Sequence, residues 1–241
     1  MRTDILGVGF DDITIGLAAQ YAGDTIERGG KTYIVTPNPE IVWMARRDAA
    51  LKNAVNSAGL VLPDGIGVII GARILGKPLR CGRAPGIEFA ETLLERMAHT
   101  GGSVFLLGAK PEIAEIAGGK LAERYQGLKI AGAADGYFSD DSQVIEEINA
   151  ALPDALLVCL GSPKQELWMA RNIARLDVKL CAGLGGVLDV FAGRAKRAPV
   201  FFRKLGLEWL YRLFREPRRI KRMLRLPLFV IAVIWTRLFR R

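Results

Sequence analysis

The stretch DALLVCLGSPKQELWMAR, residues 154–171, contains a complete strand–turn–helix unit. Residues 154–161 are short and mostly apolar, which is typical of a strand that is buried on both faces. A Gly-Ser turn follows, and Pro163 suits the first turn of a helix over 163–175. Because a buried strand that leads into a helix is half of a βαβ unit, this stretch predicts a parallel sheet.

The same alternation of apolar runs and amphipathic segments extends along most of the chain. The other predicted strands are 4–10, 31–36, 59–64, 102–108, 128–136 and 178–185. The other predicted helices are 12–28, 39–57, 65–76, 85–99, 111–126, 140–151 and 186–192. We therefore predict an α/β fold, in which a mostly parallel sheet carries helices on both faces.

The positive charge is concentrated at the C-terminal end of the 241 residues. The formal net charge is +9, but residues 194–241 hold 15 Lys and Arg against 2 Asp and Glu, whereas the rest holds 19 basic and 23 acidic residues. No strand is predicted here, and the expected short helices are 201–214, 217–225 and 227–239. We therefore predict a core over 1–193 and a basic, amphipathic helical appendage over 194–241.

Three kinds of anion suit the appendage: a nucleic acid, a membrane surface or a phosphorylated substrate. The basic helices lead into an apolar segment, residues 226–236, which is shorter than the about 20 residues that a membrane-spanning helix needs. Basic and apolar residues together are typical of an interfacial membrane element, and the apolar end has no use on a nucleic acid. A nucleic-acid-binding protein remains the alternative of a different class.

Cysteine usage and the N-terminus predict an intracellular protein. Cys81, Cys159 and Cys181 form no CxxC pair, so we expect free thiols in a reducing cytosol. The N-terminal residues show no signal-peptide pattern.

Several nucleotide-binding signatures are absent from the sequence. The glycine-rich stretch 182–199 has Leu188 where GxGxxG requires glycine, so an NAD-dependent oxidoreductase is supported by the fold class alone. There is no Walker A motif and no Asp-x-Asp pair, and we predict neither a metal nor a cofactor. Arg and Lys must then stabilise any diphosphate leaving group.

Polar residues follow the predicted strands where ligands bind in open α/β sheets, at the carboxyl ends. Thr36 and Asn38 lie beside two prolines and could bind a polar ligand, although they also suit a helix cap. Asp64 could accept a proton from a hydroxyl, although Asp-Gly also suits a turn. The only histidine, His99, is expected near the end of a helix, so a carboxylate is the more suitable base.

Two further groups follow later strands. Lys164 and Gln165 are expected at the N-terminal end of a helix, where free backbone N–H groups attract a phosphate or diphosphate. An ordinary capped helix explains them as well. Asp189 lies one turn into the helix that follows a glycine-rich loop, where a ligand can approach the backbone.

Six ordered segments between about residue 4 and residue 225 resemble the WecG/TagA/CpsF family of bacterial glycosyltransferases, glycosyltransferase family 26. They are TPNPEIV (36–42), LPDGIGV (62–68), RAPGIEF (83–89), GSPKQELWM (161–169), DVFAGRAKRAP (189–199) and GLEWLYRLFREPRR (206–219). The resemblance implies a Rossmann-like fold. It also implies inverting, metal-independent transfer of N-acetylmannosamine from a UDP-sugar to polyprenyl-diphosphate-linked N-acetylglucosamine, in teichoic acid or similar cell-wall polymer synthesis. The alternative donors are UDP-N-acetylmannosaminuronate and UDP-glucose.

The resemblance also implies roles for individual residues. Asp64 matches the proposed general base, and Thr36 and Asn38 match residues of the same pocket. Arg83 and Gln165 match polar residues that contact acceptor or donor. Tyr137 and Asp189 are expected to contact the nucleotide. The appendage arginines expected to reach the diphosphates are Arg212, Arg218, Arg219 and Arg222. We expect a peripheral protein on the cytoplasmic face of the bacterial membrane, and a homo-oligomer is left open.

Overall fold

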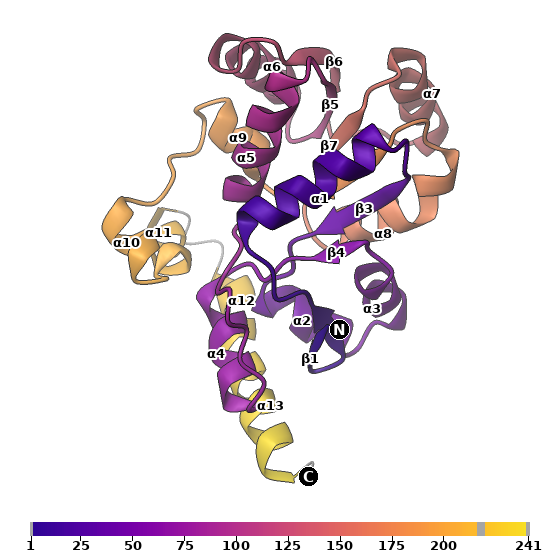
Figure 1. The fold of residues 1–241 in the computed structure, drawn as a ribbon. Coiled ribbons are helices and arrows are strands. Elements are labelled where there is room, and N and C mark those ends of the chain that lie inside the picture. The colour runs from indigo at the N-terminus through magenta and orange to yellow at the C-terminus, as the bar shows by residue number, and fades with distance from the viewer. Residues whose placement is uncertain (1, 216–219, 240–241) are drawn as a thin grey trace.

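The computed structural model describes residues 2–215 and 220–239 of the chain. Six parallel strands form its main sheet in the order β4-β3-β8-β7-β5-β6 (Figure 1). Their bounds are β3 Thr32–Val35, β4 Leu60–Val61, β5 Ser103–Gly108, β6 Lys129–Ala134, β7 Ala155–Cys159 and β8 Leu180–Gly183. The parallel sheet that the sequence predicts is thus confirmed.

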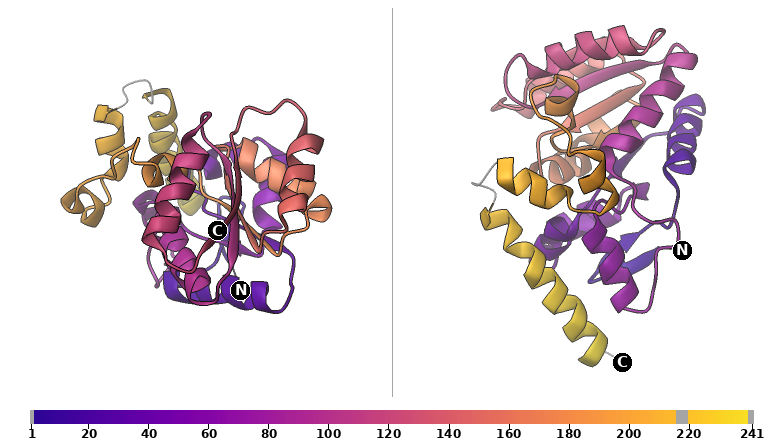
Figure 2. Two further views of the ribbon diagram at one scale, coloured as in Figure 1. Left: turned by 90° about the horizontal axis from the view of Figure 1, so that it is seen from above. Right: turned by 90° about the vertical axis from the view of Figure 1, so that its left-hand side faces the viewer.

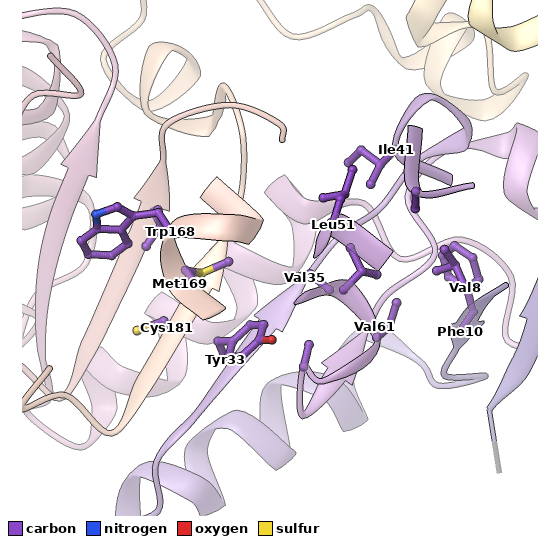
Figure 3. Packing of buried hydrophobic residues seen from close by; sticks show 14 of the residues in the cluster. Val8, Phe10, Tyr33, Val35, Ile41, Leu51, Val61, Trp168, Met169 and Cys181 are labelled. Carbon is purple, nitrogen blue, oxygen red and sulfur yellow. The ribbon is translucent and has the colours of Figure 1, made fainter. Parts of the chain in front are cut away.

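Helices cover both faces of this sheet (Figure 2). One face packs against α1 Ile15–Glu27, α5 Gly86–His99, α6 Ile113–Arg124 and α9 Val187–Phe191. The other packs against α2 Pro39–Ala45, α3 Ala49–Asn56, α4 Ile66–Ile74, α7 Asp141–Ala151 and α8 Lys164–Asn172, with a 3-10 turn at Ile173–Arg175. In β7, Leu156 and Val158 belong to the hydrophobic cluster on the second of these faces and Leu157 belongs to the cluster on the first, which explains why the strand is apolar throughout. Figure 3 shows residues of the cluster on the second face, among them Val35, Trp168 and Met169.

The N-terminal apolar run is a hairpin, so the prediction of one strand over 4–10 was wrong. β1 Thr3–Ile5 and β2 Val8–Phe10 pair antiparallel in a separate two-stranded sheet. Leu6 and Gly7, which join them, have φ angles of 56° and 93°. Positive φ at both central residues is the turn geometry that matches the twist of two hairpin strands.

The predicted helix over 39–57 is two helices, α2 and α3. Asp48 lies between them with an extended backbone, and its Oδ1 accepts a hydrogen bond from the Leu51 N–H at 2.9 Å. Such a side chain satisfies a free donor at the start of a new helix, so it favours a break here.

The C-terminal segment is helical, as the sequence predicts, but with different bounds. The predicted helix over 201–214 is split into α10 Val200–Lys204 and α11 Glu208–Arg215 by Gly206, whose φ is 71°. Among the described residues, α12 Ile220–Met223 and α13 Arg225–Phe239 follow. Residues 217–219 of the predicted helix over 217–225 lie outside the described residues.

Helix α13 packs against α2 and α4 (Figure 1). Phe229 is 1% exposed and belongs to the main core cluster. A Cβ added to Gly71 of α4 would lie 2.8 Å from the Phe229 ring, so the missing side chain allows the close approach. On the opposite face of α13, Ile231, Trp235 and Leu238 are exposed. Within residues 2–215 and 220–239, no helix is long and apolar enough to cross a membrane.

We expect one of the three cysteines to react with iodoacetamide in the native protein, and all three after unfolding. Cys81 is exposed, whereas Cys159 and Cys181 are buried. Burial raises the pKa of Cys159 to about 12 and also raises that of Cys181, so neither forms the reactive thiolate near neutral pH. Mass spectrometry of the labelled protein counts the modified thiols. Rapid native labelling at a second cysteine would contradict this packing.

Candidate active site at the carboxyl edge of the sheet

The loops after β3, β4 and β8 are joined at the carboxyl edge of the sheet. The Asp64 N–H, after β4, donates to the Pro37 carbonyl, after β3, at 3.2 Å. The Thr36 hydroxyl donates to the Gly183 carbonyl, at the end of β8, at 3.0 Å. The structure therefore brings Thr36, Asn38 and Asp64 together, as expected for neighbouring parallel strands.

A tight turn holds Asp64 at this edge. Gly65, the residue before α4, has a φ of 88°, which side chains other than hydrogen rarely allow. Gly67 lies against Pro39, and a Cβ there would be 2.6 Å from the proline ring. Asp64 itself is partly buried. The Asp-Gly turn thus places a carboxylate at the carboxyl edge of the sheet rather than in the core.

Thr36 and Asn38 have different surroundings. Asn38 caps α2, because its Oδ1 accepts from the Ile41 N–H at 3.1 Å. Thr36 is buried and its hydroxyl is bonded to β8, so it joins two strands and does not cap a helix. Asn38, which is only partly buried, is the better placed of the two to meet a ligand.

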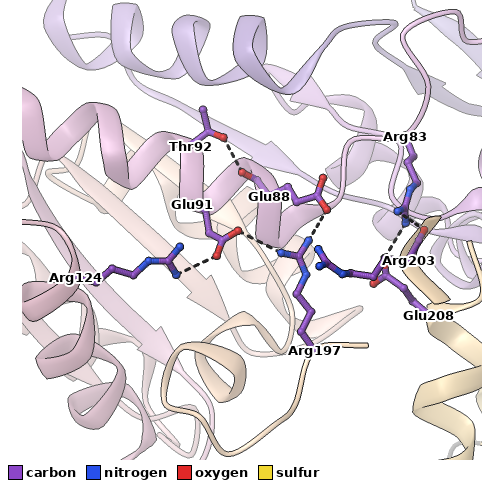
Figure 4. Close-up of polar contacts among 8 residues, drawn as sticks. All are labelled: Arg83, Glu88, Glu91, Thr92, Arg124, Arg197, Arg203 and Glu208. Atoms are coloured by element: carbon purple, nitrogen blue, oxygen red, sulfur yellow. Dashed lines mark hydrogen bonds and ion pairs between the residues drawn. The ribbon is translucent and has the colours of Figure 1, made fainter. Parts of the chain in front are cut away.

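Arg83 connects the core to the C-terminal segment (Figure 4). Its guanidinium pairs with Glu208 at 2.8 Å and donates to the Arg203 carbonyl at 2.6 Å. The adjoining Ala84 N–H donates to the Pro63 carbonyl at 2.8 Å, which holds this loop beside the Asp64 turn. Gly206 also packs here, since a Cβ on it would lie 2.7 Å from Ile66 Cβ.

Lys164 and Tyr137 form a separate group. The Lys164 ammonium donates to the Gly136 carbonyl at 2.9 Å and lies 4.6 Å from the Phe138 ring centroid. Tyr137, in the same loop after β6, is 69% exposed. Because β4 and β6 are the two edge strands, Tyr137 and Asp64 lie toward opposite ends of the row of strand ends.

Gln165 and Asp189 flank the loop that follows β8. Gln165 is 2% exposed, and its amide oxygen accepts from the Gly185 N–H at 2.9 Å. Its amide nitrogen donates to Glu166 at 2.9 Å. Asp189 is partly buried in α9, and its backbone carbonyl accepts from the Arg194 N–H. Both amide groups of Gln165 are thus used within the protein.

Sequence reasoning missed Glu166, which is fully buried. Its Oε1 accepts from the Ser162 hydroxyl at 2.8 Å as well as from Gln165. Burial raises the pKa of the Glu166 carboxyl, whereas these two hydrogen bonds lower it, and burial dominates. An acidic residue in the first turn of a helix is ordinarily solvated, so its sequence position offered no signal of burial.

We expect Glu166→Gln to remove part of the pH dependence of stability. A carboxyl whose pKa is raised on folding stabilises the folded state below its unfolded pKa, and this contribution is lost as the pH rises through the folded pKa. As the pH rises above the usual pKa of a glutamate, about 4.3, the wild-type Tm should therefore fall more than that of the variant. Thermal unfolding followed by circular dichroism tests this, and parallel Tm curves would contradict it.

A groove of about 550 Å³ lies between α1, α5 and α6 rather than at the strand ends, and Glu88, Glu91 and Glu95 contribute to its walls. Arg197 pairs with Glu88 and, at 3.4 Å, with Glu91, which also pairs with Arg124 at 3.0 Å (Figure 4). These ion pairs hold the segment after α9 against the core. The strand ends are the candidate site, because the loops that carry Asn38 and Asp64 are joined there by the hydrogen bond from the Asp64 N–H to Pro37.

Within the described part of the chain, no group of three or more His, Cys, Asp or Glu side chains is arranged to hold a metal ion.

The model of the Glycosyl transferase WecG/TagA/CpsF family matches residues 3–241. This chain belongs to the WecG/TagA/CpsF family. The resemblance carried by the six sequence segments is therefore confirmed.

Relatives of this WecG/TagA/CpsF member carry a shared name. The chain is similar to an "N-acetylglucosaminyldiphosphoundecaprenol N-acetyl-beta-D-mannosaminyltransferase" of Bacillus spizizenii, 37% identical over 87% of this chain and 81% of the relative. A protein of the same name from Staphylococcus aureus is 37% identical over 96% of this chain and 92% of the relative. These findings lend no support to a nucleic-acid-binding protein or an NAD-dependent oxidoreductase.

The appendage arginines of this family member are only partly covered by the structure. Arg218 and Arg219 lie outside the described residues. Arg212 and Arg222 belong to α11 and α12, but their side chains lie outside what the structure describes. Their expected contacts with a diphosphate stay predictions.

Proposed function

We propose that this chain transfers N-acetylmannosamine from a UDP-sugar to N-acetylglucosamine carried on polyprenyl diphosphate. The observation that carries the proposal is its 37% identity to mannosaminyltransferases of that acceptor over 96% of the chain. The partly buried Asp64 at the sheet edge supports it, because glycosyl transfer to a hydroxyl needs a base. The product would enter the synthesis of teichoic acid or a similar cell-wall polymer.

In the proposed reaction, an acceptor hydroxyl attacks C1 of the donor sugar. The oxygen forms a bond to C1 as Asp64 takes its proton. The bond between C1 and the β-phosphate oxygen breaks, and UDP leaves with the electron pair. A single displacement of this kind inverts the anomeric centre. The proposed sources of positive charge for the diphosphates, in place of a metal ion, are Arg83, Lys164, Arg212, Arg218, Arg219 and Arg222.

We further propose that the protein binds the cytoplasmic face of the bacterial membrane peripherally. The exposed Ile231, Trp235 and Leu238 support this, because they project from a helix that follows a strongly basic stretch. Apolar side chains enter the boundary between headgroups and acyl chains while the basic residues meet anionic lipids. This arrangement would bring the site to a lipid-linked acceptor.

A panel of UDP-sugars, assayed with one lipid-diphosphate-N-acetylglucosamine acceptor in the presence of EDTA, tests the proposal. We expect acceptor-dependent release of UDP with UDP-N-acetylmannosamine. A preference for UDP-N-acetylmannosaminuronate or UDP-glucose would keep the reaction class and change the sugar. Absence of acceptor-dependent UDP release with every donor would contradict the proposal.

A further inference from the structure

A chain of buried polar groups runs beneath the loop that follows β8. Glu166 is fully buried and accepts two hydrogen bonds through Oε1, from the Ser162 hydroxyl and the Gln165 amide nitrogen. The Gln165 amide oxygen then accepts from the Gly185 N–H. On the other side of the loop, Thr36 donates to the Gly183 carbonyl. The loop is therefore held between α8 and β3.

Glu166 determines which way the Gln165 amide points. The Gly185 N–H is a donor, so it needs the amide oxygen and is left unsatisfied if the amide is reversed. Glu166 Oε1 is an acceptor, so it requires the amide nitrogen at the other end. If the Gln165 amide were reversed, its nitrogen would face the Gly185 N–H and its oxygen would face Glu166 Oε1. Neither pair could form a hydrogen bond, so only the observed orientation satisfies both neighbours.

The loop is packed too closely to tolerate another arrangement. A Cβ on Gly183 would lie 2.6 Å from Met169 Cε and 3.2 Å from the Gln165 amide nitrogen. The Gln165 side chain therefore rests directly on the backbone of β8. A change in its orientation would be transmitted to residues 183–186 and, through the Gly183 carbonyl, to Thr36.

We propose that Glu166 is a positioning residue, which fixes residues 183–186 at the carboxyl edge of the sheet by holding the Gln165 amide in one orientation. Gln165 then connects α8 to the loop after β8 through hydrogen bonds, and it does not bind the donor sugar or the acceptor substrate. The consequence for catalysis rests on the proposed glycosyl transfer, whereas the consequence for the loop does not.

The second carboxyl oxygen of Glu166, Oε2, indicates which substitution should preserve the role of this residue. Glu166 Oε2 is buried and has no hydrogen-bond partner within the described residues. A neutral carboxylic acid leaves one unsatisfied hydroxyl there, which costs less than a desolvated charge. Glutamine has the same shape, keeps one accepting oxygen and is neutral, so it should substitute for Glu166.

The experiment compares Glu166→Gln with Glu166→Leu. Glu115→Leu is the matched control, because Glu115 is also an acidic first-turn residue but is exposed. Hydrogen exchange of a peptide that covers residues 183–186 reports on the loop, and kcat and KM for the UDP-sugar report on the site. Glu166→Leu should speed exchange there and lower kcat/KM about tenfold or more, because buried donors lose their acceptor. Glu166→Gln and Glu115→Leu should stay within about threefold of wild type.

Two results would overturn the proposal: wild-type exchange at residues 183–186 in Glu166→Leu, or a loss in Glu166→Gln as large as in Glu166→Leu. If Glu166→Leu does not fold, Gln165→Leu takes its place, because it removes the amide that bonds both Glu166 and the Gly185 N–H. Glu166→Gln must still match wild type. A wild-type enzyme that is inactive with every donor would contradict the proposed function, and the exchange comparison would still decide the role of Glu166.

Discussion

Asp64→Asn should lower kcat by about 100- to 10,000-fold, the usual contribution of a general base. The amide keeps the size of the carboxylate but cannot take the acceptor's proton. The Asp-Gly turn is retained, and the Asp64 backbone N–H can still donate to Pro37. We therefore expect the affinity for UDP to change little. UDP release in a coupled assay gives kcat, and isothermal titration with UDP gives the affinity.

A control at the amino ends of the strands separates the loss of the base from a general effect of removing a negative charge. Asp177 is exposed and precedes β8, so it lies toward the amino ends of the strands. Asp177→Asn removes the same charge and should leave kcat unchanged. Near-normal turnover of Asp64→Asn would show that another group acts as the base.

Phe229→Ala should destabilise the protein by about 3–5 kcal/mol, the usual cost of truncating a buried phenylalanine. Phe229 is 1% exposed and packs on Gly71, so the substitution leaves a cavity between α13 and α4. Equilibrium unfolding in urea measures the free energy of unfolding. The effect should be large although Phe229 belongs to the last helix that the structure describes.

Trp235→Ala on the same helix is the matched control. Trp235 is 63% exposed, so its loss should change the free energy of unfolding by no more than about 0.5 kcal/mol. It should instead weaken binding to anionic liposomes in a flotation assay. Equal stability of Phe229→Ala and wild type would contradict the docking of α13, and unchanged liposome binding of Trp235→Ala would contradict its proposed membrane face.

The sequence predicted the main sheet well because its strands are buried on both faces. Residues 154–161 and 102–108 read as continuous apolar runs, and Leu156, Leu157 and Val158 are indeed all fully buried. The run at 4–10 is also mostly apolar but folds as a hairpin. Leu6-Gly7 is not a typical turn pair, and the reversal is seen only in the backbone, where both residues have a positive φ.

The candidate site could be predicted as far as it depends on local order along the chain. Asp64 and Asn38 directly follow strands, so a parallel sheet brings them to one edge. The role of Gln165 could not be read in this way. Its amide is held by Glu166 and Gly185, and the burial of Glu166 depends on how α8 packs against the sheet.

Tertiary packing also decides which face of α13 is exposed. Residues 226–236 are apolar on all sides, so the sequence indicated an interfacial helix without saying that one side joins the core. In the structure, Phe229 and Val233 are buried against the core, while Ile231 and Trp235 remain exposed. The segment is thus a structural helix and, in our proposal, a membrane contact.

The central claim is a single displacement at C1, and the anomeric configuration of the product tests it most directly. The disaccharide formed from UDP-N-acetylmannosamine and a lipid-diphosphate-N-acetylglucosamine acceptor can be released by mild acid and examined by NMR. From an α-linked donor, a single displacement gives a β-linked N-acetylmannosamine, which is the result we predict. An α-linked product would contradict the account.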